Sequence, residues 1–120
     1  MATVVLDTNV AIYLLEGRLA QPIQASDICV SVITEIELLG YRGLDEQAEE
    51  SIRKFLTLVR RLPLDDAVTE ETILVRRSSN LKIGDAIIAA TARVANAELL
   101  THDSSLLALP NLISSAPALK

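Results

Sequence analysis

The fold of this chain is decided near its start, by residues 3–15, which read TVVLDTNVAIYLL. Thr3–Leu6 is the kind of short, β-branched and apolar run that is typical of a buried strand. Thr8 and Asn9 then offer capping oxygens ahead of the apolar run Val10–Leu15, which predicts a helix. The chain therefore opens with a strand, a turn and a helix.

The same alternation continues along the chain. We predict further strands at 28–32, 62–64, 98–101 and 112–113, and further helices at 33–41, 45–61, 65–77 and 86–96. The helix at 45–61 is the clearest, because Ile52, Phe55 and Leu56 share one face and charged residues occupy the other. Strands alternating with helices favour an α/β fold. We expect a three-layer α/β/α sandwich with a central, mainly parallel sheet of roughly four to five strands.

Length and composition narrow the class of protein. At 120 residues, half of them hydrophobic, the chain is long enough for one compact domain and too short for two, so we expect a single domain over 1–120. Cys29 is the only cysteine, which excludes an internal disulfide and suits a reducing compartment. The sequence has no leader-like run and no apolar stretch of membrane length. We therefore expect a cytoplasmic protein without a membrane anchor.

The net charge of the chain bears on whether it could bind RNA. Sixteen acidic against eleven basic residues give a net charge of -5, which at first argues against a polyanionic partner. Four of the acids belong to the site proposed below, however, and the rest nearly balance the bases. Acidity therefore does not exclude RNA. Tyr13, Tyr41 and Phe55 are the only aromatic residues, so we do not expect passive binding of single strands by base stacking.

Four isolated carboxylates stand where such a fold would gather them. Asp7 and Asp103 follow predicted strands, Asp85 opens the most apolar helix, and Glu37 lies on the apolar face of its helix. Ligands of parallel sheets bind beyond the carboxyl ends of the strands. Two like charges about 4 Å apart repel by roughly 4 kcal/mol at an effective dielectric near 20, so a shared cation would stabilise this arrangement. Oxygen ligands favour Mg²⁺ or Mn²⁺ over zinc.

Each acid also has a purely structural interpretation. Asp7, Asp85 and Asp103 are each placed to cap a helix, although Thr8 and Asn9 offer to cap the first helix instead. Glu37 would then pair with an arginine. We favour Glu37 over its neighbour Glu35 for the site, because Glu35 points away from the apolar face.

Four segments carry a resemblance to a known family: VLDTNVAIY at 5–13, VSVITEIELL at 30–39, LKIGDAIIAATA at 81–92 and LTHD at 100–103. In this order and spacing the chain resembles the PIN-domain nucleases, in particular the VapC-type toxins. The resemblance covers nearly the whole chain. It departs from the family pattern at Gly84, where proline is common, and at Ser105, where many members carry a further acid or amide. The second departure bears on how firmly a second metal ion is held.

The resemblance implies a function and a set of site residues. Asp7, Glu37, Asp85 and Asp103 would be the catalytic, metal-binding acids, with one or two Mg²⁺ or Mn²⁺ ions, and Asn9 and Thr101 would orient them. The activity implied is metal-dependent cleavage of an RNA phosphodiester by the toxin of a type II toxin-antitoxin pair. A cognate antitoxin and a homodimer are implied as partners.

Other residues near the motifs are more ambiguous. Arg76, Arg77 and Lys82 stand just before Asp85, where they would hold RNA phosphates or simply stabilise the end of a helix. We interpret His102, the only histidine, as a surface residue rather than a ligand or base.

Three other functions remain open on the sequence. A haloacid-dehalogenase-type phosphatase would need a second acid two residues after Asp7, where this chain has Asn9. A phosphorylatable receiver module would need paired acids after the first strand and a phosphoacceptor near the middle of the chain, which is an amphipathic helix here. A PIN-fold scaffold would bind RNA or protein without cutting.

Overall fold

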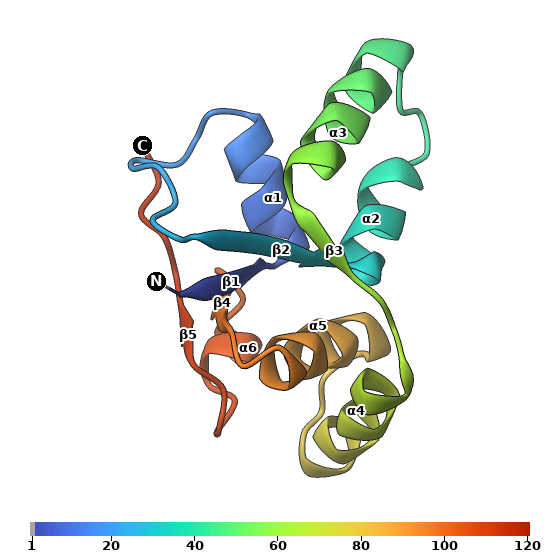
Figure 1. The fold of residues 1–120 in the computed structure, drawn as a ribbon, viewed down its shortest axis with the longest axis vertical. Helices are drawn as coiled ribbons and strands as arrows, with labels where there is room; N and C mark the ends of the chain where they lie inside the picture. Colours follow the sequence, from blue (N-terminus) through green and yellow to red (C-terminus); the bar gives the residue numbers. More distant parts are fainter. Residues whose placement is uncertain (1) are drawn as a thin grey trace.

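A parallel sheet of five strands, in the order β3-β2-β1-β4-β5, forms the centre of the protein (Figure 1). The computed structural model describes residues 2–120. The strands are β1 (Thr3–Leu6), β2 (Asp27–Ser31), β3 (Arg60–Leu62), β4 (Glu98–Leu100) and β5 (Ser114–Ser115). Because β1 pairs with both β2 and β4, the strand order reverses beside it. Such a reversal opens a crevice at the carboxyl ends of the two central strands.

Helices cover both faces of the sheet. They are α1 (Thr8–Leu15), α2 (Val32–Leu39), α3 (Glu46–Leu58), α4 (Asp66–Ser78), α5 (Ile83–Val94) and α6 (Ser104–Leu107). In Figure 1, α1, α2 and α3 lie above the sheet and α4, α5 and α6 below it. The α/β/α sandwich predicted from the sequence is confirmed, as is the parallel sheet.

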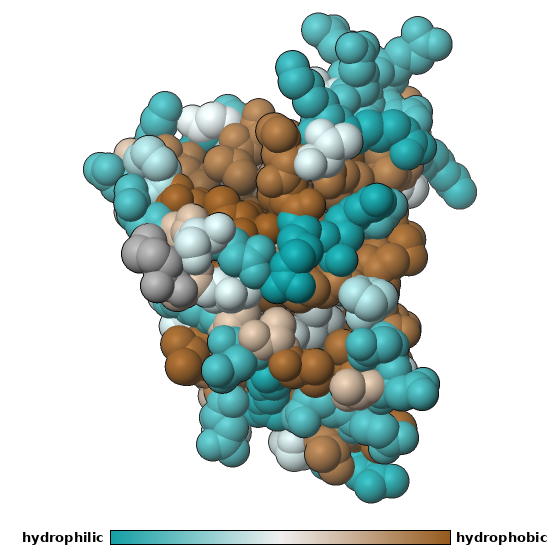
Figure 2. All heavy atoms as spheres, in the orientation of Figure 1, coloured by the Kyte–Doolittle hydropathy of each residue, from teal (hydrophilic) through white to brown (hydrophobic). Residues whose placement is uncertain are grey.

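The core is split into two layers by the alternation of side chains along β1. Val4 and Leu6 pack with buried residues of α1 and α3, whereas Val5 packs with α5 on the opposite face. Residues 86–92, within α5, are buried without exception, which explains why this helix has no charge in its middle. In Figure 2 the outer end of α3 is covered by hydrophilic side chains, as its amphipathic sequence predicts.

Two of the predicted strands lie elsewhere. The strand predicted at 62–64 occupies Arg60–Leu62, and α3 ends at Leu58 rather than at Arg61. Ion pairs explain the shift, because Arg60 reaches Asp27 at 2.6 Å and Arg61 reaches Glu35 at 2.8 Å when this segment is extended. The closing strand predicted at 112–113 occupies Ser114–Ser115 instead.

The first turns of two helices also differ from the prediction. The first helix begins at Thr8 instead of Val10, and α5 begins at Ile83 instead of Ala86. The prediction places each helix start at the first residue of its apolar run. The helical hydrogen bonds begin two or three residues earlier. Within residues 2–120, no helix has the length and apolar character needed to cross a membrane.

The first turn of α5 gives a prediction about stability. A Cβ added to Gly84 would meet nothing closer than Ile33 Cγ2 at 3.7 Å, which is an ordinary contact. Glycine costs a helix about 0.5–1 kcal/mol relative to alanine, so Gly84→Ala should raise the free energy of unfolding in urea by about that amount.

Gly17 is the matched control for this substitution. A Cβ there would also meet nothing within 4 Å, but its φ is +70°. Gly17→Ala should therefore lower the free energy of unfolding by about 1–2 kcal/mol. The same loss for both variants would refute the account of Gly84.

Candidate metal centre

Four acids that interact through their charges come from four different segments of the chain. Asp7 follows β1, Asp103 follows β4, Glu37 lies in α2 and Asp85 lies in the first turn of α5. The backbone N–H of Asp7 donates to Leu100 O at 2.9 Å, so the pairing of β1 with β4 extends to the first acid. The fold thus carries residues far apart in the sequence to one end of the sheet.

Asp7 is the most buried of the four acids, with 6% of its surface exposed. Its Oδ1 accepts from the backbone N–H of Thr8 at 2.8 Å, and its Oδ2 accepts from Thr101 Oγ1 at 2.7 Å. Burial raises the pKa of Asp7, the two hydrogen bonds oppose that rise, and the charges of Asp103 and Glu37 add to it. Asp7 therefore ionises at a cost, which hydrogen bonding only partly offsets.

Asp7 is also the N-cap of α1. The prediction that Thr8 and Asn9 would offer the capping oxygens is therefore wrong. A carboxylate has about four lone-pair positions, and the two hydrogen bonds use only two of them. Asp7 can thus cap the helix and still have lone pairs free for a further ligand.

The charges of all three other acids affect the pKa of Asp85. Burial raises its pKa first, and the negative charges of Asp7, Asp103 and Glu37 raise it further, while Lys82 opposes them. The N-cap position of α5 belongs to Lys82, whose side chain makes no capping bond, so Asp85 is not the cap that we considered. Its position is explained by no hydrogen bond or ion pair among the described residues.

Glu37 is held by hydroxyl groups. Thr8 Oγ1 donates to Glu37 Oε1 at 2.5 Å, and Thr8 Oγ1 lies 3.0 Å from Thr34 Oγ1. Among residues 2–120 it makes no ion pair, whereas Glu35 pairs with Arg61. Glu37 and its neighbour Ile36 are both exposed, so the prediction that Glu37 lies on a buried apolar face of its helix is wrong. The charge of Glu37, but not that of Glu35, contributes to the raised pKa of Asp7 and Asp85.

Asp103 caps α6 through one oxygen. Its Oδ1 accepts from the backbone N–H groups of Ser105 at 2.8 Å and Leu106 at 3.4 Å. Its own N–H donates to Thr101 Oγ1 at 3.0 Å, and that hydroxyl donates in turn to Asp7. Thr101 therefore links two of the acids, as an orienting residue would.

The sequence identified only part of this support. Asn9, which we expected to orient the acids, lies exposed on α1 and makes no hydrogen bond to any of them within the described chain. Thr8, which we considered only as a cap, donates to Glu37, and Thr34, which we did not single out, lies within hydrogen-bond distance of Thr8. The spacing of Thr34 and Glu37, one helical turn apart on the same side of α2, was the signal that would have found the second of them.

The donor set suits a hard divalent cation, but the side chains do not form a finished coordination shell. Across the described residues, no three acidic, histidine or cysteine side chains come close enough together to hold an ion. Burial and the charges of neighbouring acids nevertheless raise the pKa of Asp7 and of Asp85, and Mg²⁺ or Mn²⁺ would neutralise such carboxylates. The fit therefore rests on oxygen chemistry and shared electrostatics.

His102 is half-buried beside this centre rather than exposed as predicted. Its ring meets that of Tyr13 edge to face, with 5.6 Å between the centroids. His102 Nε2 is buried and has no hydrogen-bond partner among the described residues. The contact with Tyr13 covers part of this side chain.

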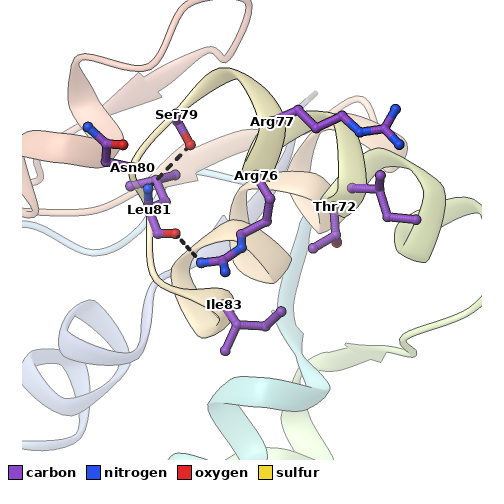
Figure 3. A pocket seen from close by; sticks show the side chains of 8 residues that line it. Thr72, Arg76, Arg77, Ser79, Asn80, Leu81 and Ile83 are labelled. Carbon is purple, nitrogen blue, oxygen red and sulfur yellow. Dashed lines mark hydrogen bonds between the residues drawn. The ribbon is translucent and has the colours of Figure 1, made fainter.

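A groove of about 590 Å³ lies between the end of α4 and the start of α5 (Figure 3), and none of the four acids lines it. Arg76 and Arg77 both line it, and Arg76 donates to Leu81 O at 2.7 Å. Lys82 is exposed beside the groove. Five other arginines are neutralised by ion pairs, namely Arg18, Arg53, Arg60, Arg61 and Arg93. Arg76, Arg77 and Lys82 have no such carboxylate partner in the described part of the chain.

Solved structures with a similar fold come from several bacteria. A toxin-antitoxin complex from Klebsiella pneumoniae aligns with a TM-score of 0.74 and 28% identity, covering 92% of this chain and 95% of that one. FitAcB from Neisseria gonorrhoeae aligns with a TM-score of 0.74 and 25% identity, covering 95% of this chain and 97% of that one. VapBC2 from Rickettsia felis, bound to a promoter DNA fragment, aligns at 0.82 and 21% identity, covering 97% and 99%.

Sequence comparison gives the family directly. No curated protein matches the chain significantly. The sequence profile of the PIN domain matches residues 4–112, which include all four acids and every strand except the last. The chain therefore belongs to the PIN domain family.

Proposed function

We propose that this chain is a metal-dependent endoribonuclease, and that it is the VapC-type toxin of a type II toxin-antitoxin pair acting in the cytoplasm. The observation that carries the proposal is the electrostatic coupling of Asp7, Glu37, Asp85 and Asp103 at the point where the strand order reverses. Membership of the PIN domain family supports it, as does the similarity to a toxin-antitoxin complex at 28% identity.

The four acids would hold one or two Mg²⁺ or Mn²⁺ ions. When bound, such an ion supplies a Lewis acid for the phosphate and lowers the pKa of the attacking water. The chain's own residues hold three of the acids, Asp7, Glu37 and Asp103, in place through hydrogen bonds. Thr101 fixes Asp7 Oδ2, and the N-terminus of α6 fixes Asp103 Oδ1, which leaves the other oxygen of Asp103 free.

Two kinds of protein partner follow from the same proposal. We propose a cognate antitoxin that covers the centre, and a homodimer of this chain. The apolar side chains beside the acids support a protein contact, because Ile36 is 58% exposed and Ile83 is 61% exposed. Apolar surface next to a charged site is typical of a surface that a partner covers.

RNA would be held by the basic side chains beside the groove. Arg77 and Lys82 are free of carboxylate partners in the described part of the chain, and Lys82 lies near enough to Asp85 to lower its pKa. We assign them to phosphate contacts that position the strand. Arg76 contributes less directly, because its guanidinium already holds the loop at Leu81.

Cleavage tests the proposal itself. Purified protein is incubated with total RNA in Mg²⁺ or Mn²⁺, beside Asp7→Asn and Asp85→Asn purified in the same way. We expect discrete cleavage products from the wild type and a loss of more than about 100-fold in both variants, beyond the roughly 10–100-fold cost of losing a supporting hydrogen bond. Equal cutting by all three proteins would indicate a contaminating nuclease. No cutting by the wild type would favour a non-catalytic scaffold.

The raised pKa of Asp85 also predicts how the stability of the folded protein depends on pH. The raised pKa of Asp85 means that its ionisation opposes folding, so the penalty is absent at low pH and grows as pH rises above about 3.9, the value in unfolded chains. In EDTA at pH 7, Asp85→Asn should therefore melt at a higher temperature than the wild type, and the difference should close near pH 3.

With Mn²⁺ in place of EDTA at pH 7, the wild type should melt at a higher temperature than Asp85→Asn. An ion at 100 times its dissociation constant stabilises the protein that binds it by about 2.7 kcal/mol, and Asp85→Asn should gain much less. Glu50→Gln, an exposed acid of α3, serves as the control and should behave like the wild type. If EDTA and Mn²⁺ left the two melting temperatures in the same order, the metal site would be wrongly assigned.

The proposed roles of Arg77 and Lys82 predict how salt affects the affinity for RNA. In the Asp85→Asn background the RNA stays intact, so fluorescence anisotropy measures binding alone. Arg77→Ala and Lys82→Ala should each reduce the slope of log K against log salt by about 0.7–0.9, the share of one phosphate contact. Lys54→Ala removes an exposed base of α3 and should leave the slope unchanged. An equal effect of all three variants would mean that RNA binds by overall charge and not at this groove.

A further inference from the structure

Two threonines form a chain of hydroxyl groups that ends on Glu37. Thr8 Oγ1 donates to Glu37 Oε1 at 2.5 Å. The same oxygen lies 3.0 Å from Oγ1 of Thr34, which is completely buried. A hydroxyl has a single proton, and that of Thr8 is committed to the carboxylate. Thr34 must therefore donate to Thr8, which gives the order Thr34 to Thr8 to Glu37.

Other buried threonines of this protein satisfy their hydroxyls differently. Thr72 and Thr91 each donate to the carbonyl four residues earlier in their own helix, at Val68 O and Ile87 O, both at 2.7 Å. That bond is the ordinary solution for a buried threonine in a helix. Thr34 instead reaches from α2 to α1. Its hydroxyl is thus directed toward an acid of the candidate centre, which core packing alone does not require.

Glu37 is exposed, and within residues 2–120 the hydroxyl of Thr8 is the one side-chain donor that reaches its carboxylate. Its charge raises the pKa of both Asp7 and Asp85, and it makes no ion pair within residues 2–120. Without this bond, nothing in the described part of the chain would keep so exposed a side chain in one orientation. A hydrogen bond to a carboxylate is about twice as strong as one between neutral groups, and a second donor behind Thr8 polarises it further.

Thr8 restrains two acids at once. Its backbone N–H donates to Asp7 Oδ1 at 2.8 Å, while its hydroxyl holds Glu37. We propose that Thr8 and Thr34 are positioning residues that hold Glu37 against the repulsion of the other acids, so that its carboxylate faces the bound divalent ion. This inference rests on the proposed function of the centre.

The test separates the position of Glu37 from the binding of metal. Thr8→Val removes the hydroxyl at nearly constant volume, and Thr8→Ser retains it. In EDTA, three-bond NMR couplings to Glu37 Cγ report its χ1 rotamer. We expect one rotamer in the wild type and in Thr8→Ser, and averaged couplings in Thr8→Val. A single Glu37 rotamer in Thr8→Val would overturn the proposal.

Mn²⁺ binding, followed by calorimetry, gives the second measurement. Thr8→Val should weaken the dissociation constant by about 10–100-fold, as the loss of an outer-shell partner does, and Thr34→Val should weaken it less. Thr8→Ser should restore wild-type affinity, and Thr91→Val, which alters a buried threonine outside the centre, should leave it unchanged. Equal losses in Thr8→Ser and Thr8→Val would also overturn the proposal.

Two further controls keep these outcomes distinct. If Thr8→Val unfolds, the double variant Thr8→Val/Thr34→Val removes the donor left without a partner, and the couplings are measured there. A wild-type protein that binds no Mn²⁺ would contradict the proposed function of the centre. The Glu37 couplings would then decide by themselves whether the threonines position this side chain.

Discussion

Repulsion among four carboxylates is the constraint on which this end of the molecule depends. Asp85 is affected by the charges of all three other acids, and Asp7 by two of them. Each acid except Asp85 is restrained by hydrogen bonds from hydroxyl or backbone N–H groups, and not by a cation. Such donors keep a carboxylate ionised and oriented while they leave part of the net negative charge uncompensated. A divalent cation is the ligand that this leftover charge favours.

The buried core of the rest of the fold offsets the destabilising repulsion at this site. β1 and β4 are the strands beside the crevice, and their apolar residues are buried on both faces. The middle of α5 is fully buried behind Asp85. Fixed strands and a central helix hold the backbone of the acids in place, so that only side chains need to respond to the charge. Sites on rigid elements keep their geometry better than sites on loops.

The sequence predicted the layers of the fold well, because apolar periodicity reports burial directly. Val4 and Leu6 lie on one face of β1 and Val5 on the other, as a strand buried on both sides requires. β5 was placed two residues too early because Ser114 and Ser115 carry no apolar signal, whereas Leu112 and Ile113 do. The extended segment at Arg60 and Arg61 depends on ion pairs to Asp27 and Glu35, which no local pattern reveals.

The candidate centre was predictable to a different degree. The four acids come together at the strand ends because topology dictates where the strand ends lie. Their supports were harder to predict, because Thr8 meets Thr34 and Glu37 across separations of 26 and 29 residues. Asn9 matched the resemblance but lies exposed in the first turn of α1, while the hydroxyl of the preceding residue turns inward. Capping also depends on backbone angles, which is why Asp7 caps α1 although its neighbours seemed able to do so.

A crystal structure of the wild-type protein soaked in Mn²⁺, with anomalous scattering recorded, tests the central claim most directly. The account predicts an anomalous peak among Asp7, Glu37, Asp85 and Asp103, with carboxylate oxygens about 2.0–2.3 Å from the ion, a distance typical of a small hard cation bound by oxygen. Because no three of these side chains already form a shell, the peak should be accompanied by rotamer changes. The absence of a peak there at millimolar Mn²⁺, with all four side chains unmoved, would contradict the account.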